Sequence, residues 1–308
     1  MKIEVVLTEA EIVQELSEAV EARDLPEKFF YWSPLSVHAW LVRASDPAFA
    51  GWRHCWKLLA ERSDWLLEPF SGAVPVISFG AGDGTTDRVL LDRVRASGRE
   101  QKYFPVDASQ ALLEMACAGA EDLDIETAGI KADISSPMHL VFASDAAESP
   151  KLMLMGGNTL GGFDPLDLVR HLGENLHEGD RLVIDAEMQP SNGSAPFEDD
   201  GLCQFALAPL ASLGASADEG EVRCDHRRDD SMEGLYVTAA RFRPSRDLRL
   251  TVSDHEVLVE RGENINLSFR YTFTAEAFRE LIGRQGGMRL LEEITSPDGR
   301  YMLAVCSR

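Results

Sequence analysis

The segment Val74–Asp87 constrains the fold of this 308-residue chain more than any other. Its apolar residues Val76–Phe79 precede three glycines, Gly80, Gly82 and Gly84, and an amphipathic stretch follows directly. This order predicts a strand, a tight turn and a helix. Glycine suits such a turn because it adopts backbone angles that a Cβ forbids and because a ligand can then lie against the main chain.

A second apolar run, Tyr103–Val106, ends in Asp107. A carboxylate at the end of the strand that follows a glycine-rich turn is placed to accept hydrogen bonds from the two hydroxyls of a ribose. Either feature alone is as compatible with an ordinary turn or a capping residue. Together they predict a site for a nucleoside-containing cofactor, and the G-x-G-x-G spacing does not require a pyrophosphate.

The composition excludes several classes of partner. A formal net charge of −22 argues against nucleic acid and against an anionic membrane surface. The N-terminal residues 1–11 lack the apolar core of a signal peptide, so we expect a cytoplasmic protein. The five scattered cysteines form no C-x-x-C pair and the seven histidines no H-E-x-x-H motif, so we expect neither a disulfide framework nor a metal site.

The distribution of apolar residues indicates an α/β fold. The first sixty or so residues have helical spacing, and from Val74 onward strand and helix patterns alternate, which predicts a parallel sheet covered by helices. The last segment, 290–305, contains two strand patterns around a Ser-Pro-Asp-Gly turn. That arrangement predicts an antiparallel hairpin, because the strands are too closely linked to be parallel.

An insertion interrupts this alternation. Residues 188–221 contain clusters of Pro, Ser, Gly and Asp with only short apolar pieces, and strand patterns dominate after them. Residues 265–273 alternate cleanly, which predicts one face in the core and one free for water or ligand. We expect Asp225 and His226, which lie among arginines, in a solvated loop. A helix is predicted from Thr274 to about Gly286.

These features resemble the class I S-adenosylmethionine-dependent methyltransferases. More specifically, the chain resembles the histidine-specific methyltransferase family, which makes trimethylhistidine for ergothioneine biosynthesis and includes relatives acting on tryptophan-derived amines. The resemblance covers about residue 25 to the end. The segments that carry it are Leu25–Tyr31, Phe79–Thr85, Arg88–Asp92, Pro105–Ser109, Ala132–Asp133, Gly156–Pro165, Gly179–Val183, Gly262–Phe273 and Pro297–Gly299.

The resemblance implies a two-part architecture. A class I methyltransferase Rossmann-like sheet, mostly parallel with a C-terminal antiparallel hairpin, would be formed by residues 61–189 and 281–308 and would bind S-adenosyl-L-methionine. A smaller α+β substrate domain would be formed by residues 1–60 and 190–280. A small-molecule amine or amino acid would be held between them, and its nitrogen methylated.

The resemblance also implies the cofactor-binding residues. Gly80 and Gly82 would approach the methionine part of the cofactor, Asp107 would bind the ribose, and Asp133 would accept from the adenine amino group. The alternative for Asp133 is a helix or turn cap. The full predicted set is Gly80, Ala81, Gly82, Thr86, Asp107, Ala108, Asp133, Ile134 and Gly157.

The substrate positions depart from the family's pattern. The family has an asparagine at Gly162 that contacts the substrate's amino acid part, and a glutamate and a serine at Ser268 and Arg270 that grip the imidazole. Two family tyrosines fall near Phe49 and Phe197. Without these polar partners a site discriminates strongly against histidine, so we expect an acceptor other than histidine. The predicted substrate-binding set is Tyr31, Phe49, Asn158, Gly162, Phe197, Ser268 and Arg270.

Two of these residues carry specific hypotheses. Tyr31 is the family position that this chain retains, and it is the candidate catalytic residue that would orient the acceptor; the alternative is an aromatic core residue. Arg270 has donors only, so it would grip a carboxylate or phosphate of the acceptor, form an internal ion pair, or point into water.

Two other functions stay open at this point. A non-catalytic family member would keep the cofactor site without a working substrate pocket. A nicotinamide-dependent reductase is disfavoured, because the glycine pattern lacks the third, helix-packing position and the sheet ends in a hairpin.

Overall fold

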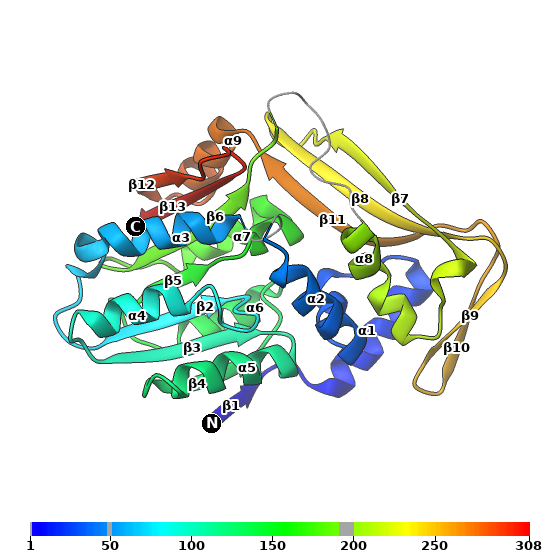
Figure 1. Ribbon diagram of the computed structural model, residues 1–308, viewed down its shortest axis with the longest axis horizontal. Helices are drawn as coiled ribbons and strands as arrows, with labels where there is room; N and C mark the ends of the chain where they lie inside the picture. Colours follow the sequence, from blue (N-terminus) through cyan, green and yellow to red (C-terminus); the bar gives the residue numbers. More distant parts are fainter. Residues whose placement is uncertain (1, 48–50, 191–199) are drawn as a thin grey trace.

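A computed structural model describes residues 2–47, 51–190 and 200–308. Within them, eight strands form one large sheet in the order β1-β4-β3-β2-β5-β6-β13-β12 (Figure 1). Its strands are β1 (Lys2–Val5), β2 (Val74–Phe79), β3 (Gln101–Asp107), β4 (Glu126–Lys131), β5 (Leu152–Met155), β6 (Arg181–Glu187), β12 (Arg289–Thr295) and β13 (Tyr301–Ser307). Pairing is parallel from β1 through β6, and β13 is antiparallel to both β6 and β12. The predicted α/β class, with a mostly parallel sheet and a C-terminal antiparallel hairpin, is confirmed.

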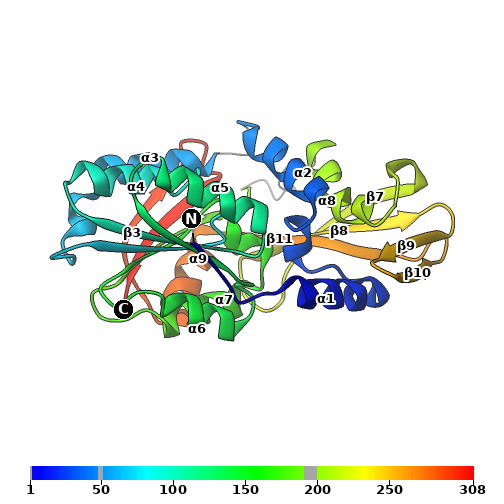
Figure 2. The same cartoon turned by 90° about the horizontal axis from the view of Figure 1, so that it is seen from below.

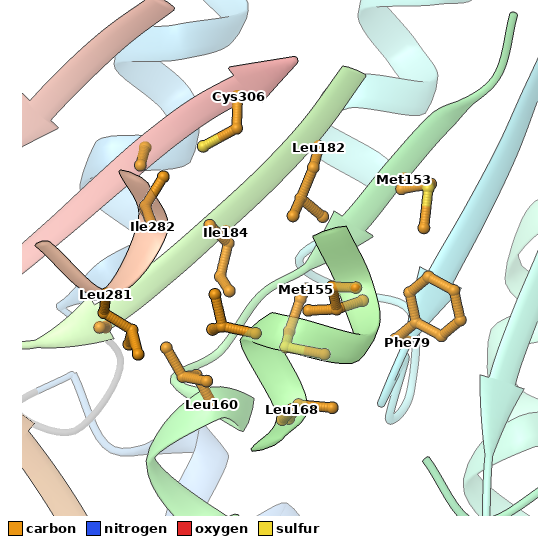
Figure 3. Packing of buried hydrophobic residues seen from close by; sticks show 14 of the residues in the cluster. Phe79, Met153, Met155, Leu160, Leu168, Leu182, Ile184, Leu281, Ile282 and Cys306 are labelled. Carbon is orange, nitrogen blue, oxygen red and sulfur yellow. The ribbon is translucent and has the colours of Figure 1, made fainter. Parts of the chain in front are cut away.

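Helices cover both faces of this sheet (Figure 2). One face carries α3 (Trp52–Arg62), α4 (Arg88–Ala96) and α5 (Gln110–Glu121), and the other carries α6 (Pro137–Ser144), α7 (Pro165–Glu174) and α9 (Ala275–Glu280). Figure 3 shows the core under the second group, where Met155 of β5 and Ile184 of β6 pack with Leu168 of α7. Burying aliphatic side chains on both faces explains why the central strands are almost continuously apolar.

A second layer of structure lies beyond the carboxyl ends of the parallel strands (Figure 1). A three-stranded antiparallel sheet has the order β11-β8-β7, and a separate hairpin pairs β9 with β10. The elements are β7 (Gly220–Arg228), β8 (Leu235–Pro244), β9 (Leu248–Val252), β10 (His255–Val259), β11 (Ile265–Phe273), α1 (Glu9–Ala22), α2 (Pro34–Ser45), α8 (Asp200–Ser212) and the short 3-10 turns η1 (Glu27–Phe30) and η3 (Thr159–Gly162). Apolar residues of α1, η1, α8 and these strands form a hydrophobic core of their own, separate from those of the large sheet.

The N-terminal segment differs from its predicted helical structure. Residues 2–5 form β1, which pairs in parallel with β4 at the edge of the large sheet. Helix α3 packs on β6, β12 and β13, with Trp52 and Trp56 buried. The domain boundary at residue 60 stays a prediction; of the elements before it, β1 is an edge strand of the large sheet and α3 packs on that sheet.

The region after the insertion also needs corrections. Asp225 and His226 lie in strand β7 rather than in a loop, because residues 220–228 alternate between half-buried and exposed positions. In β11, a bulge between Asn266 and Ser268 shifts the register, so Phe269 is 38% exposed instead of sharing the core face with Ile265. Helix α8 forms in the segment expected to be irregular. The helix predicted after Thr274 is present, because Thr274 Oγ1 accepts from the amide of Ala277 and caps it.

No helix formed by the described residues combines the length and apolar character that a membrane crossing needs.

Candidate active site

A cavity lies where the carboxyl ends of β2 and β3 meet the turn η1 and strand β11. Its lining contains every predicted site residue that the structure describes. These are Tyr31, Gly80, Ala81, Gly82, Thr86, Asp107, Ala108, Asp133, Ile134, Gly157, Asn158, Gly162, Ser268 and Arg270. Phe49 and Phe197 lie outside the described residues. Segments separated by more than two hundred positions therefore converge on one site.

The glycine-rich turn after β2 adopts the backbone that its sequence predicts. Gly80 and Gly82 have φ values of +69° and +56°, a region that side chains other than glycine rarely adopt. A Cβ at Gly80 would stand 2.6 Å from Cγ2 of Thr159. The turn thus brings main chain directly to the cavity wall, and Thr159 occupies the space that a larger residue would need.

Asp107, at the end of β3, holds this turn in place. Its Oδ2 accepts from the amide of Gly82 at 2.8 Å and its Oδ1 from the amide of Ser109 at 2.9 Å. Burial raises the pKa of Asp107 to about 6, against the opposing effect of these amide donors. The carboxylate reaches the cavity with further lone pairs for a ligand's hydroxyl groups.

The pKa of Asp133, which follows β4, is shifted in the opposite direction. Lys28 Nζ lies 2.7 Å from its Oδ2, and the amide of Ser135 donates to its Oδ1 at 2.9 Å. Burial favours a higher pKa for Asp133, but the charge of Lys28 and these hydrogen bonds outweigh it and lower the pKa. Asp133 is therefore an ionised acceptor on the cavity wall, and the bond from Ser135 shows that it also closes a local turn.

A buried carboxylate holds the loop after β5 through hydrogen bonds. Asp185 of β6 accepts from the amides of Gly157 and Asn158 at 3.0 and 2.6 Å and from the indole of Trp56. Asn158 itself is 4% exposed, and its Oδ1 accepts from the amide of Glu187. Its Nδ2 has no hydrogen-bond partner within the described part of the chain. A buried amide nitrogen beside a cavity is a donor suited to a bound ligand.

Glu27 was not predicted, and it also lines the cavity. Its carboxylate accepts a hydrogen bond from the hydroxyl of Tyr31 at 2.8 Å. Burial raises the pKa of Glu27 to about 7, with Tyr31 and the charge of Arg270 acting in the other direction. The ring of Tyr31 packs against those of Trp40 and Phe205, with centroids 6.4 and 5.7 Å away. Tyr31 is thus both part of an aromatic wall and the donor to a cavity carboxylate.

Arg270 approaches the same end from β11. Its Nη1 lies 3.4 Å from Oε2 of Glu187, whose other oxygen accepts from Nε of Arg300 at 2.9 Å. The side chain of Glu187 is 1% exposed and that of Arg270 is 29% exposed. Of the three hypotheses for Arg270, the internal ion pair is present, and the residue lines the cavity.

The sequence analysis also missed Lys28, Asp185 and Glu187. Glu27 could have been noticed from its position four residues before Tyr31, a separation that brings side chains together on a helical turn. The ion pairs of Lys28 and Glu187 join segments that lie far apart in sequence, and no local pattern signals them. Across residues 2–47, 51–190 and 200–308, no group of three or more His, Cys, Asp or Glu side chains is arranged to hold a metal ion.

Comparisons with known proteins identify the family of this chain. A family model described as histidine-specific methyltransferase, SAM-dependent, matches residues 8–308. The chain is 24% identical to a histidine N-alpha-methyltransferase from Mycolicibacterium smegmatis over 93% of its own length and 91% of that protein.

Solved structures of methyltransferases align at low identity. An S-adenosylmethionine-dependent methyltransferase from Clostridium acetobutylicum shares 12% identity, over 88% of this chain and 96% of that one, with a TM-score of 0.45. An amino pentose methyltransferase from Micromonospora echinaspora shares 14% identity, over 90% and 98% of the two chains, with a TM-score of 0.42. Because the family model covers nearly the whole sequence, the chain belongs to the histidine-specific, S-adenosylmethionine-dependent methyltransferase family.

Proposed function

We propose that this methyltransferase transfers a methyl group to the nitrogen of a small amino acid or amine other than histidine. The cofactor would be bound by residues 61–189 and 281–308, and the acceptor by residues 1–60 and 190–280. The observation that carries the proposal is the continuous cavity, which joins Gly82 and Asp107 to Glu27 and Arg270.

The residues at one end of the cavity fit S-adenosyl-L-methionine, which supplies a methyl group on a sulfonium sulfur when bound. Asp107 would accept from the ribose hydroxyls, and Asp133 from the adenine amino group. The main chain at Gly80 and Gly82 would lie against the methionine part. The buried Nδ2 of Asn158 is a donor for a carboxylate, and its lack of a partner among the described residues supports a ligand there.

The other end supports an acceptor different from histidine. Gly162 presents no side chain where the resembling family has an asparagine, and Arg270 can only donate where an imidazole needs an acceptor as well. Tyr31, Trp40 and Phe205 line this end with aromatic surface. An acceptor with an amine, an apolar body and an acidic group near Arg270 would satisfy these walls. Tyr31 would position the acceptor, and the aromatic rings would exclude water from the reacting atoms.

Histidine is the second candidate, because the family description and the relative from Mycolicibacterium smegmatis both name it. Methyl-labelled S-adenosylmethionine incubated with a library of amines and amino acids, L-histidine included, decides between them by mass spectrometry. Our proposal expects label on an amine nitrogen other than that of histidine. Label on histidine alone would favour the second candidate, and cofactor binding without transfer to any compound would favour a non-catalytic family member.

The acidic-group hypothesis has its own test. Replacing Arg270 with alanine should raise the KM for an acidic acceptor about ten- to a hundredfold, because a charge-assisted hydrogen bond is lost. Arg223→Ala is the matched control, since Arg223 lies on β7 with 60% of its side chain exposed. Equal KM values in Arg270→Ala and the wild-type protein would contradict a role for Arg270 in acceptor binding.

A further inference from the structure

The carboxylate of Glu27 lies where a side chain at Gly162 would otherwise be. Its Cδ and Oε1 are each 3.0 Å from the position that a Cβ at Gly162 would occupy. Because Gly162 has no side chain, this space stays open, and a carboxylate from the turn η1 fills it. That group can carry a negative charge and accept a proton.

The other carboxylates of the cavity are engaged elsewhere. Asp107 receives two backbone amides, Asp133 is paired with Lys28, and Asp87 accepts from the hydroxyl of Tyr103. Asp83 accepts from the amide and hydroxyl of Thr85 within the glycine-rich turn. Glu27 differs from these four because it lies beside the open position of Gly162 and because the charge of Arg270 acts on it.

The elements that line the cavity with Glu27 contribute the cations Lys28, Arg43 and Arg270, and the charge of Arg270 already acts on Glu27. Strand β11 contributes Ser268 and Arg270, α2 contributes Trp40 and Arg43, α8 contributes Phe205, and η1 and its C-cap contribute Lys28 and Tyr31. Lys28 is paired with Asp133 and Glu15, and Arg270 with Glu187. A ligand that covers this end would remove water from Glu27, and a buried carboxylate then needs a cationic or proton-donating partner.

From this arrangement we infer that Glu27 binds the protonated amine of the acceptor and takes its proton, so that the acceptor class is a primary or secondary amine that arrives as a cation. The inference rests on the proposed N-methyl transfer. A pKa of about 7 for Glu27 suits proton exchange near neutral pH.

The proposed reaction consists of a proton transfer followed by a methyl transfer. The Glu27 carboxylate removes one proton from the ammonium group, which leaves a neutral amine with a free lone pair. That lone pair forms the new nitrogen–carbon bond to the methyl group, while the carbon–sulfur bond breaks and its electron pair stays on sulfur. The positive charge passes from sulfur to the methylated nitrogen, and Glu27 releases its proton to water when the product leaves.

The test measures amine recognition separately from turnover. Calorimetry records the binding of S-adenosylhomocysteine, and then of phenethylamine, L-histidine and the neutral 2-phenylethanol, to the loaded protein. The variants are Glu27→Gln and, as a matched control, Glu178→Gln, whose position is exposed. We expect at least one amine to bind the wild-type and control proteins. Glu27→Gln should weaken it about ten- to a hundredfold, because an ionic hydrogen bond is lost, and should leave S-adenosylhomocysteine binding unchanged.

Three outcomes would overturn the inference: no binding of either amine to the loaded wild-type protein, equal amine affinity in Glu27→Gln, or equal loss in Glu178→Gln. A fall in S-adenosylhomocysteine affinity in Glu27→Gln would equally contradict it, since Glu27 would then support the fold or the cofactor end. Failure of the proposed function is distinguishable, because it would appear as absent label transfer in the wild-type protein while amine binding still depends on Glu27.

Discussion

Asp107 and Asp133 end neighbouring strands and line the same cavity, yet their environments move their pKa values in opposite directions. Asp107 is surrounded by backbone amides and buried apolar groups, and its pKa is raised to about 6. Asp133 faces the ammonium group of Lys28, and its pKa is lowered. At neutral pH both are ionised, but only Asp107 is free of a cationic partner that competes with a ligand's hydroxyl groups.

We predict that Asp107→Ala weakens S-adenosylhomocysteine binding by about tenfold or more, because buried hydroxyl donors of the ligand lose their acceptor. The substitution also removes the hydrogen bond that holds the amide of Gly82. Isothermal calorimetry gives the affinity. Asp92→Asn, at an exposed position of α4, is the matched control and should bind normally. Unchanged affinity in Asp107→Ala would remove the ribose assignment.

Burial raises the proton affinity of Glu27, and a hydrogen bond from Tyr31 lowers it. That bond favours the charged carboxylate and opposes the effect of burial on its pKa. In Tyr31→Phe the pKa of Glu27 should therefore rise further above about 7. Carbon-13 NMR of glutamate-labelled protein can follow the titration, with Glu27→Gln identifying the resonance. A pKa that stays in place or falls would show that the phenol does not interact with the carboxylate in solution.

At the scale of single elements, the turn between β2 and α4 depends on both space and backbone angle. Gly80 has φ +69° and no room for a Cβ beside Thr159, whereas Gly98 has φ +75° and open space around it. Gly98→Ala should cost about 1–2 kcal/mol from the left-handed backbone alone. Gly80→Ala should cost more and should also weaken S-adenosylhomocysteine binding.

Denaturant unfolding and calorimetry on the two variants measure these effects. Suppose that both variants lose the same free energy of unfolding and keep their affinity for S-adenosylhomocysteine. The close approach of Thr159 to Gly80 would then make no contribution to stability or to binding.

Elements with a strong local pattern could be predicted from the sequence, and elements that depend on remote partners could not. The glycine turn, Asp107 and the β12–β13 hairpin follow from composition and spacing. Strand β1 has only four residues, and it is a strand because β4, over a hundred positions later, supplies its partner. Exposed and half-buried positions alternate along β7. The exposed residues are charged and the inward-facing ones are only half-buried, so the hydrophobic pattern of this strand is weak.

The same distinction applies to the site. Residues of the glycine turn and of strand ends could be found because chain connectivity places them. Glu27 gains its role from the missing side chain at Gly162, and that proximity exists only in the folded chain. The register shift in β11 likewise changes which face Phe269 and Arg270 occupy, and a bulge leaves no clear mark in the amino-acid pattern.

At the scale of the whole molecule, several buried carboxyl groups have raised pKa values. Burial raises the pKa of Glu27 and Asp87 to about 7, and that of Asp107 and Asp185 to about 6, from ordinary values of 4.5 for Glu and 3.8 for Asp. Between these ordinary and raised values the folded chain binds more protons than the unfolded chain. Above the ordinary values of the carboxyl groups, the free energy of unfolding should therefore fall as the pH rises from about 5 to about 7.

Repulsion among the negative charges, which give a net charge of −22, also lowers the free energy of unfolding as the pH rises. Added salt screens this repulsion, so it should partly restore stability near neutral pH. Urea unfolding across this pH range measures the slope, and Asp87→Asn should flatten it because one of the titrating groups is removed. A free energy of unfolding that increases steadily from about pH 5 to about pH 7 would contradict the proton balance.

We propose that one cavity holds the cofactor at Asp107 and an amine at Glu27. A crystal structure of the protein with S-adenosylhomocysteine and the methylated amine recovered from the labelling experiment would show both positions. We predict the ribose hydroxyls on the carboxylate of Asp107 and the methylated nitrogen within hydrogen-bond distance of Glu27. An amine nitrogen on another wall, or a ribose remote from Asp107, would contradict it.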